Sequence, residues 1–170
     1  MQLTYLMACI VPLTNALTAL CQVPVSTQTT QPAETVKENV KGLTTVASAF
    51  SPKETMDRLE ADIRAKGLTV FARIDDAAGA EEVGLTLRPT ELIIFGNARG
   101  GTPLMQASQT AGIDLPLKAL VWQDAAGKTW ISYEEPSWIV QRHHLGIKAG
   151  IIDKLAAALS VIVQAATKNQ

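Results

Sequence analysis

The feature that most constrains the fold is an apolar segment near the middle of the chain, Thr90-Glu91-Leu92-Ile93-Ile94-Phe95. An apolar run of this kind suits a central strand of a sheet rather than an edge strand, because a central strand is covered on both faces. Gly96 and Asn97 follow at once and end the strand. The rest of the chain must therefore supply neighbouring strands and a covering layer.

The clearest helix lies between residues 51 and 67. Ser51 can cap its first turn, Pro52 suits the first helical position, and Glu54 completes a capping box. Apolar side chains then recur at helical spacing, at Met56, Leu59 and Ile63. Gly67 ends the helix.

The remaining elements alternate irregularly. Thr102-Pro103 repeats the cap-and-proline signature and predicts a helix over 102–111. We predict strands at 42–49, 68–74, 118–123 and 128–133, the last two forming a hairpin, and short helices at 77–83 and 136–143. A long C-terminal helix over 148–168 carries the apolar stripe Ile151, Leu155, Leu159, Ile162 and Ala166. This order favours an α+β fold with an antiparallel-rich mixed sheet packed against helices.

The N-terminus has the pattern of an export signal. Residues 1–21 carry no charged side chain, and their apolar stretch from Leu3 to Leu13 has the length of a signal-peptide core, too short to span a membrane. Ala19 and Cys21 place small residues where signal peptidase reads them, before a cut at Gln22. We predict a signal peptide at 1–21, a flexible linker at 22–39, one domain at 40–170 with no transmembrane helix in the mature form, and a periplasmic or other extracytoplasmic location.

Two alternatives remain open at this end of the chain. Residues 17–21 approximate a lipobox, which would attach a lipid anchor at Cys21, and a cytoplasmic protein with a misassigned start is the other reading. Cys9 and Cys21 are the only cysteines, so disulfides, cysteine-based metal sites and a cysteine nucleophile are excluded from the mature domain. Fifteen basic against 16 acidic residues give a net charge of -1, which argues against nucleic acid as a partner.

Several strings resemble the domain-of-unknown-function family 302, in the family's order and spacing. They are 72–75, 77–80, 87–97, 101–106, 114–122 and 142–143. The resemblance implies a compact domain of the TATA-binding-protein-like α+β type, but neither DNA binding nor a particular reaction, because fold does not determine function. Asp76 stands where the family's pattern reads His, so this chain offers a carboxylate in place of that imidazole.

The glycine-rich segment 96–102 is the first candidate site. It joins the central strand to the predicted helix, where free backbone N–H groups and the helix dipole favour a small anion such as a carboxylate. Its candidate ligand-binding residues are Asn97, Arg99, Gly100, Gly101 and Thr102. The alternative is that the glycines only permit a tight turn and Thr102 only caps the helix.

The second candidate site depends on His143, because His143 and His144 are the only histidines and adjacent helical residues point in different directions. His143, Asp75 and Glu134 could converge near the glycine-rich segment in a metal-handling or acid–base group. The alternative is that His143 sits at a helix C-terminus and that the acids cap turns. Similarly, Trp122, Trp130 and Trp138 either line a pocket or fill the core.

The sequence therefore supports three functions for an exported domain. A non-catalytic module that binds a small ligand or a protein, with a homodimer among the options, is the preferred one. A metal-handling protein or enzyme and a structural, envelope-associated protein are the alternatives. The motifs identify no cofactor, no metal site and no catalytic residue.

Overall fold

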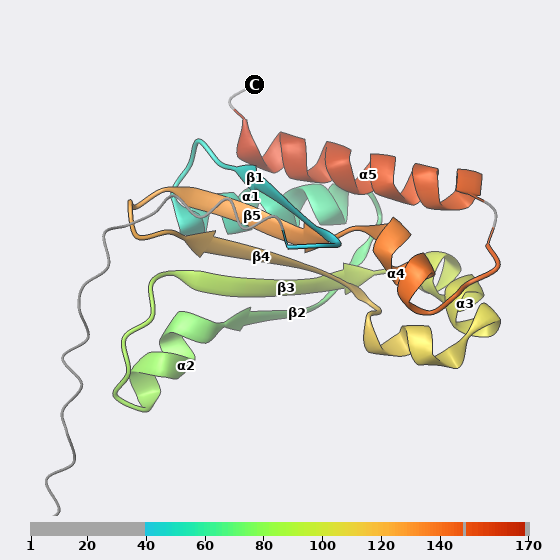
Figure 1. The fold of residues 1–170 in the computed structure, drawn as a ribbon. Helices are drawn as coiled ribbons and strands as arrows, with labels where there is room; N and C mark the ends of the chain where they lie inside the picture. The colour runs from blue at the N-terminus through green and yellow to red at the C-terminus, as the bar shows by residue number, and fades with distance from the viewer. Residues whose placement is uncertain (1–39, 148, 169–170) are drawn as a thin grey trace, which may run out of the picture. The chain divides into compact units, whose positions relative to one another are not determined.

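The computed structural model describes residues 40–147 and 149–168. The predicted signal peptide, the linker at 22–39 and the lipidation site Cys21 lie outside these residues. Within them, five strands form one sheet in the order β1-β5-β4-β3-β2 (Figure 1). The strands are β1 (Leu43–Ala47), β2 (Thr69–Asp75), β3 (Thr90–Gly96), β4 (Leu117–Gln123) and β5 (Thr129–Glu134).

The helices are α1 (Pro52–Ala65), α2 (Asp76–Glu82), α3 (Ala98–Ala107), α4 (Pro136–Arg142) and α5 (Ala149–Thr167), with a 3₁₀ turn η1 (Gln109–Ile113) between α3 and β4. Each described pairing of neighbouring strands is antiparallel. The predicted central strand pairs with β2 on one side and β4 on the other. The α+β prediction is confirmed.

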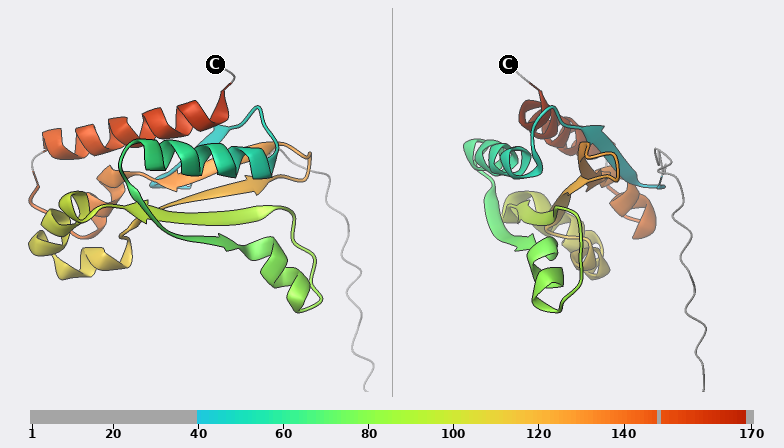
Figure 2. Two further views of the ribbon diagram at one scale, coloured as in Figure 1. Left: turned by 180° about the vertical axis from the view of Figure 1, so that it is seen from behind. Right: turned by 90° about the vertical axis from the view of Figure 1, so that its left-hand side faces the viewer.

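One face of the sheet is covered by α1 and α5, which lie side by side along it (Figure 2). The capped helix predicted after Ser51 is confirmed, since the Ser51 hydroxyl accepts a hydrogen bond from the Glu54 N–H. The helices and the covered face of the sheet bury one continuous core. Its members include Met56, Leu59, Ile63, Ile93, Phe95, Val121, Ile131, Ile162 and Val163.

Along each strand, side chains point alternately to the core face and to the opposite face of the sheet. The opposite face carries Leu92, Ile94 and Leu120, which are only partly buried. The rings of Trp122 and Trp130 stack there, with centroids 6.1 Å apart. Two of the three tryptophans thus pack against each other on the hairpin of β4 and β5.

The start of α3 differs from the prediction. Asn97, not Thr102, is the N-cap, and the helix begins at Ala98 with Pro103 inside it. The Asn97 side chain accepts a hydrogen bond from the Gly100 N–H at 2.7 Å, which satisfies a donor of the first turn five residues earlier than predicted. The helix also ends early, because Ser108 has an extended backbone and the chain continues as η1.

The predicted apolar stripe of α5 is confirmed at Leu155, Leu159, Ile162 and Ala166, which lie in the core or against it, and is wrong at its first position. Ile152 is buried, whereas Ile151 is 53% exposed. By length and composition alone, residues 150–167 could also cross a membrane, a test that core helices pass as well. Here Leu159, Val163 and Ala166 of α5 belong to the core, so the helix has a packing role within this domain.

Candidate functional site

A hollow of about 310 Å³ lies beside the N-terminal half of α3, and we call it the α3 pocket. Four of the residues singled out in the glycine-rich segment line it: Asn97, Gly100, Gly101 and Thr102. The rest of the lining is supplied by α3 itself, by the end of β3, by the approach to β4 and its first residue, by β2 and the residue before it, and by α5. These residues are Leu68, Phe71, Gly96, Ala98, Leu104, Met105, Leu115, Pro116, Leu117 and Leu155.

The α3 pocket is apolar. Of the described residues that line it, none is charged, and Arg99 is not among them. The side-chain oxygen of Asn97 is already engaged by the Gly100 N–H. The glycine-rich segment was expected to present a loop of free N–H groups, but it forms the first turns of a capped helix. The pocket is therefore suited to hydrocarbon rather than to a buried anion.

Gly101 lines the α3 pocket at a point where a side chain could be added. A Cβ atom placed there would lie 3.9 Å from Leu115 and from Met105, an ordinary contact distance. A small side chain would thus fit without backbone movement, whereas a larger one would occupy the pocket. Gly101 is therefore the position from which the pocket can be filled.

His143 belongs to a separate group, which we call the His143 cluster: Thr110, Asp114, Arg142 and His143. The imidazole Nε2 lies 2.6 Å from a carboxylate oxygen of Asp114, and Nδ1 lies 3.0 Å from the hydroxyl of Thr110. Arg142 donates to the other oxygen of Asp114 at 2.9 Å. The side chains of His143 and Asp114 are 8% and 9% exposed. The cluster joins η1 to the C-terminal end of α4.

The electrostatics place Glu134 near this cluster. Burial, followed by the charge of Asp114, raises the pKa of Glu134 above its ordinary value, while Lys118, Arg142 and His143 act in the opposite direction. A hydroxyl, an imidazole and a carboxylate in sequence resemble the order of a nucleophile, a base and its orienting group. Nevertheless, none of these residues lines the α3 pocket, and Arg142 already compensates the carboxylate of Asp114. The cluster is best explained as a buried polar tether.

Asp75 is remote from His143. It caps α2 by accepting a hydrogen bond from the Ala78 N–H at 2.9 Å. Figure 1 shows α2 and α4 at opposite ends of the sheet. Asp76, the first residue of α2, is exposed. The structure therefore brings His143 and Glu134 into one neighbourhood and leaves Asp75 outside it.

The true partner of His143, Asp114, was missed because 29 residues separate the two in sequence. The sequence did carry a signal for both residues. Asp114 begins one of the strings that resemble family 302, and His143 ends another. In the described part of the chain, no group of three or more His, Cys, Asp or Glu side chains is arranged to hold a metal ion.

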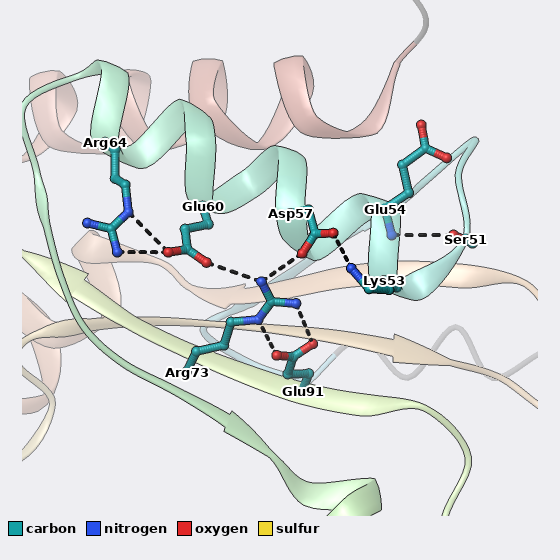
Figure 3. A network of polar contacts seen from close by, with 8 residues as sticks. All are labelled: Ser51, Lys53, Glu54, Asp57, Glu60, Arg64, Arg73 and Glu91. Atoms are coloured by element: carbon teal, nitrogen blue, oxygen red, sulfur yellow. Dashed lines mark hydrogen bonds and ion pairs between the residues drawn. The ribbon is translucent and has the colours of Figure 1, made fainter.

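A larger and more polar hollow, about 600 Å³, lies between the start of α1 and α2 and includes Arg73 and Asp75 in its lining. Arg73 is the centre of an ion-pair network (Figure 3). It pairs with Glu91 on β3, and on α1 with Asp57 at 2.8 Å and Glu60 at 3.1 Å. Three carboxylates therefore compensate this guanidinium, and they would oppose an anionic ligand beside it.

The hydrogen bonds of this network also shift the pKa values of its members. The pKa of Asp57 is lowered by hydrogen bonds from Lys53 and then Arg73. The hydrogen bond to Glu91 raises the pKa of Arg73 above its already high value. The network fastens α1 to the β2–β3 edge of the sheet, and it has a structural role in the described residues.

Comparison with known proteins finds curated relatives, a solved structure and a family model. Fluoride-specific ion channel FluC 1 of Brucella suis biovar 1 (strain 1330) is 50% identical over 113 residues, which are 66% of this chain and 44% of that protein. Fluoride-specific ion channel FluC 2 of Brucella melitensis biotype 1 is also 50% identical over 113 residues, 42% of its length. The chain thus spans less than half of these curated relatives.

Among solved structures, the uncharacterized conserved protein DUF302 from Bacillus stearothermophilus has a similar fold. The TM-score is 0.67 at 21% sequence identity, and the match covers 75% of this chain and 99% of that one. The model of the family "Domain of unknown function DUF302" matches residues 44–164. This range holds four strands in full and β1 from its second residue, every residue that lines the α3 pocket, and the His143 cluster. This chain belongs to the DUF302 family.

Proposed function

We propose that this protein is a non-catalytic module that binds a small, largely apolar ligand in the α3 pocket. The observation that carries the proposal is the pocket itself, about 310 Å³ and lined mainly by aliphatic and aromatic side chains. Small-molecule sites are typically concave and apolar with a few polar groups, from about 300 Å³ upward. Asn97 and Thr102 would be those polar groups.

The lining supports binding rather than turnover. A catalytic site needs a nucleophile or a base within reach of the bound substrate. The lining residues described here include Thr102 but no histidine, cysteine, lysine or carboxylate. We therefore assign the His143 cluster to stability and the pocket to recognition.

The test is direct binding of N-phenyl-1-naphthylamine, an uncharged fluorescent probe, to the full chain. Gly101→Leu should lower its affinity by more than about tenfold, because the added side chain occupies the pocket. Gly79→Leu is the matched control, since it makes the same change in α2 where a Cβ would meet nothing within 4 Å. Equal binding by both variants, or no saturable binding by the unaltered protein, would disprove the proposal.

As a second candidate we propose self-association through the sheet face that carries Ile94, Leu120 and the Trp122–Trp130 pair, with a second copy of this chain as the partner. The projected area of this sheet face is roughly 500 Å², from five strands of about six residues each. This is less than the approximately 800 Å² that each partner buries in a standard interface. The homodimer would therefore be weak and concentration-dependent. Sedimentation should show it at high concentration, and Leu120→Lys should abolish it; a monomer throughout would refute it.

We further propose that the domain is exported after removal of residues 1–21, with a lipid at Cys21 as the alternative. The support is the sequence pattern alone. Intact-mass analysis of protein from its own host decides between them. A species beginning at Gln22 supports a cleaved signal, an acylated Cys21 supports the anchor, and an intact N-terminus contradicts both.

A further inference from the structure

A second hollow of about 390 Å³ lies next to the α3 pocket, between the C-terminal end of α1 and α5. Its lining consists of Lys66, Leu68, Ala157, Ala158, Val161 and Ile162. We propose that the two hollows form one groove that binds a single-chain fatty acid, with the hydrocarbon tail in the α3 pocket and the carboxylate beside Lys66. This inference rests on the function proposed above and specifies its ligand.

Leu68 connects the two hollows, because it lines both. On α5, Leu155 lines the first hollow, whereas Ala158 and Ile162 line the second. Residues spaced by three, four and seven positions share one face of a helix. At 1.5 Å per residue, this stretch of α5 adds about 10 Å to the length of the α3 pocket. An elongated ligand matches that path better than a compact ring.

The single positive charge of the groove indicates which head group the ligand carries. Of the described residues lining either hollow, Lys66 is the only charged one. Lys66 caps the C-terminus of α1 and is exposed, so an ammonium group is available at the solvent end. The neighbouring Arg64, in contrast, is paired with Glu60 at 2.8 Å. A carboxylate head with an apolar tail complements this distribution of one cation and many apolar walls.

The rim of the groove exposes apolar side chains that such a tail would cover. Phe71, at the α3 pocket, is 57% exposed, and Val161, at the second hollow, is 53% exposed. Phe71 lies at an irregularity in the pairing of β2 with β3, between Val70 and Ala72. Burial of these surfaces is a favourable contribution that a ligand confined to the α3 pocket would leave partly unused.

The experiment is displacement of N-phenyl-1-naphthylamine from the full chain by saturated carboxylates of increasing length, from octanoate to hexadecanoate, with the corresponding alcohols in parallel. All ligands are kept below their aggregation limits. Each methylene that enters the groove should raise affinity by about fourfold, from roughly 0.8 kcal/mol per buried CH₂. The rise should continue to longer chains in the unaltered protein than in a variant whose second hollow is filled.

Ala158→Trp fills the second hollow, and Ala126→Trp is its control at an exposed position of the β4–β5 turn, outside both hollows. The first should remove the gain from the longest chains and the second should keep it. Lys66→Gln should weaken the carboxylates by about two- to fivefold, the range of an exposed ion pair, and leave the alcohols unchanged. Lys128→Gln, exposed beside the β4–β5 turn and lining neither hollow, should change neither series.

The outcomes separate this inference from the proposed function. If probe binding depends on Gly101 but the chain-length series is the same in Ala158→Trp and in the unaltered protein, the groove is refuted and the α3 pocket stands. Equal weakening of acids and alcohols by Lys66→Gln refutes the head-group assignment. Binding only to anionic phospholipid vesicles, without stoichiometric uptake of monomeric fatty acid, refutes it in favour of membrane association. Absence of saturable probe binding refutes both proposals.

Discussion

Asp114 is the residue on which the His143 cluster depends, since one carboxylate serves both the imidazole of His143 and the guanidinium of Arg142. Asp114→Asn keeps the shape but removes the charge that both partners face. We expect a loss of about 1–3 kcal/mol in the free energy of unfolding, because a hydrogen bond to a charged group is lost and a buried donor is left poorly paired. Urea denaturation measures it.

His144→Asn is the control for this prediction. His144 is exposed and has a left-handed backbone, with φ of 51°, which Asn tolerates well. Its stability should stay within about 0.5 kcal/mol of the unaltered protein. Similar losses in Asp114→Asn and His144→Asn would show that the cluster contributes nothing specific.

At the level of an element, two residues could begin helix α3, Asn97 or Thr102. Asn97 caps the helix in the structure, whereas Thr102 lies inside it and is exposed. Asn97→Ala should therefore cost about 1 kcal/mol, within a usual range of about 0.5–2 kcal/mol for a lost cap. Thr102→Ala should change stability by less than about 0.5 kcal/mol. Thermal unfolding of both variants ranks them, and the reverse ranking would place the helix start at Thr102.

For the molecule as a whole, the Arg73 network predicts how stability depends on pH. Hydrogen bonds, first from Arg64 and then from Arg73, lower the pKa of Glu60, and the pKa of Asp57 is lowered as well. A folded-state pKa below the unfolded value gives stability that is present above the unfolded pKa, near 4, and is lost as pH falls through the folded pKa. Acid should therefore unfold this domain in part by discharging these carboxylates.

Arg73→Met should remove about 1 kcal/mol at pH 7 and low salt, since each exposed ion pair contributes at most about that much. The difference should shrink below about pH 4, where the carboxylates protonate, and in high salt. Arg58→Met is the control, because Arg58 pairs only with Glu54 on the same helix among the ion pairs described. If the loss of stability changes with pH in the same way in Arg73→Met and in Arg58→Met, α1 is not fastened to the sheet through Arg73.

Most of the elements followed from local signals in the sequence. The cap at Ser51, the break at Gly67 and the turn 124–127 act within a few residues, so they can be recognised without knowing the fold. The central position of β3 followed from its apolar run, because a strand covered on both sides needs continuous hydrophobic side chains. Where two local signals competed, as Asn97 and Thr102 did before Pro103, the sequence pattern selected the wrong one.

The sequence by itself determined the class of fold and the order of its helices and strands along the chain, because hydrophobic period and capping chemistry depend on neighbouring residues. The family followed from the resemblance of several sequence strings. Only the tertiary structure decided which distant groups meet. It paired His143 with Asp114 rather than Asp75, gathered carboxylates from two elements around Arg73, and set Leu68 beside Leu155 to line an apolar pocket. The physical reason is that contacts between remote residues depend on the register of the sheet and the packing of the helices.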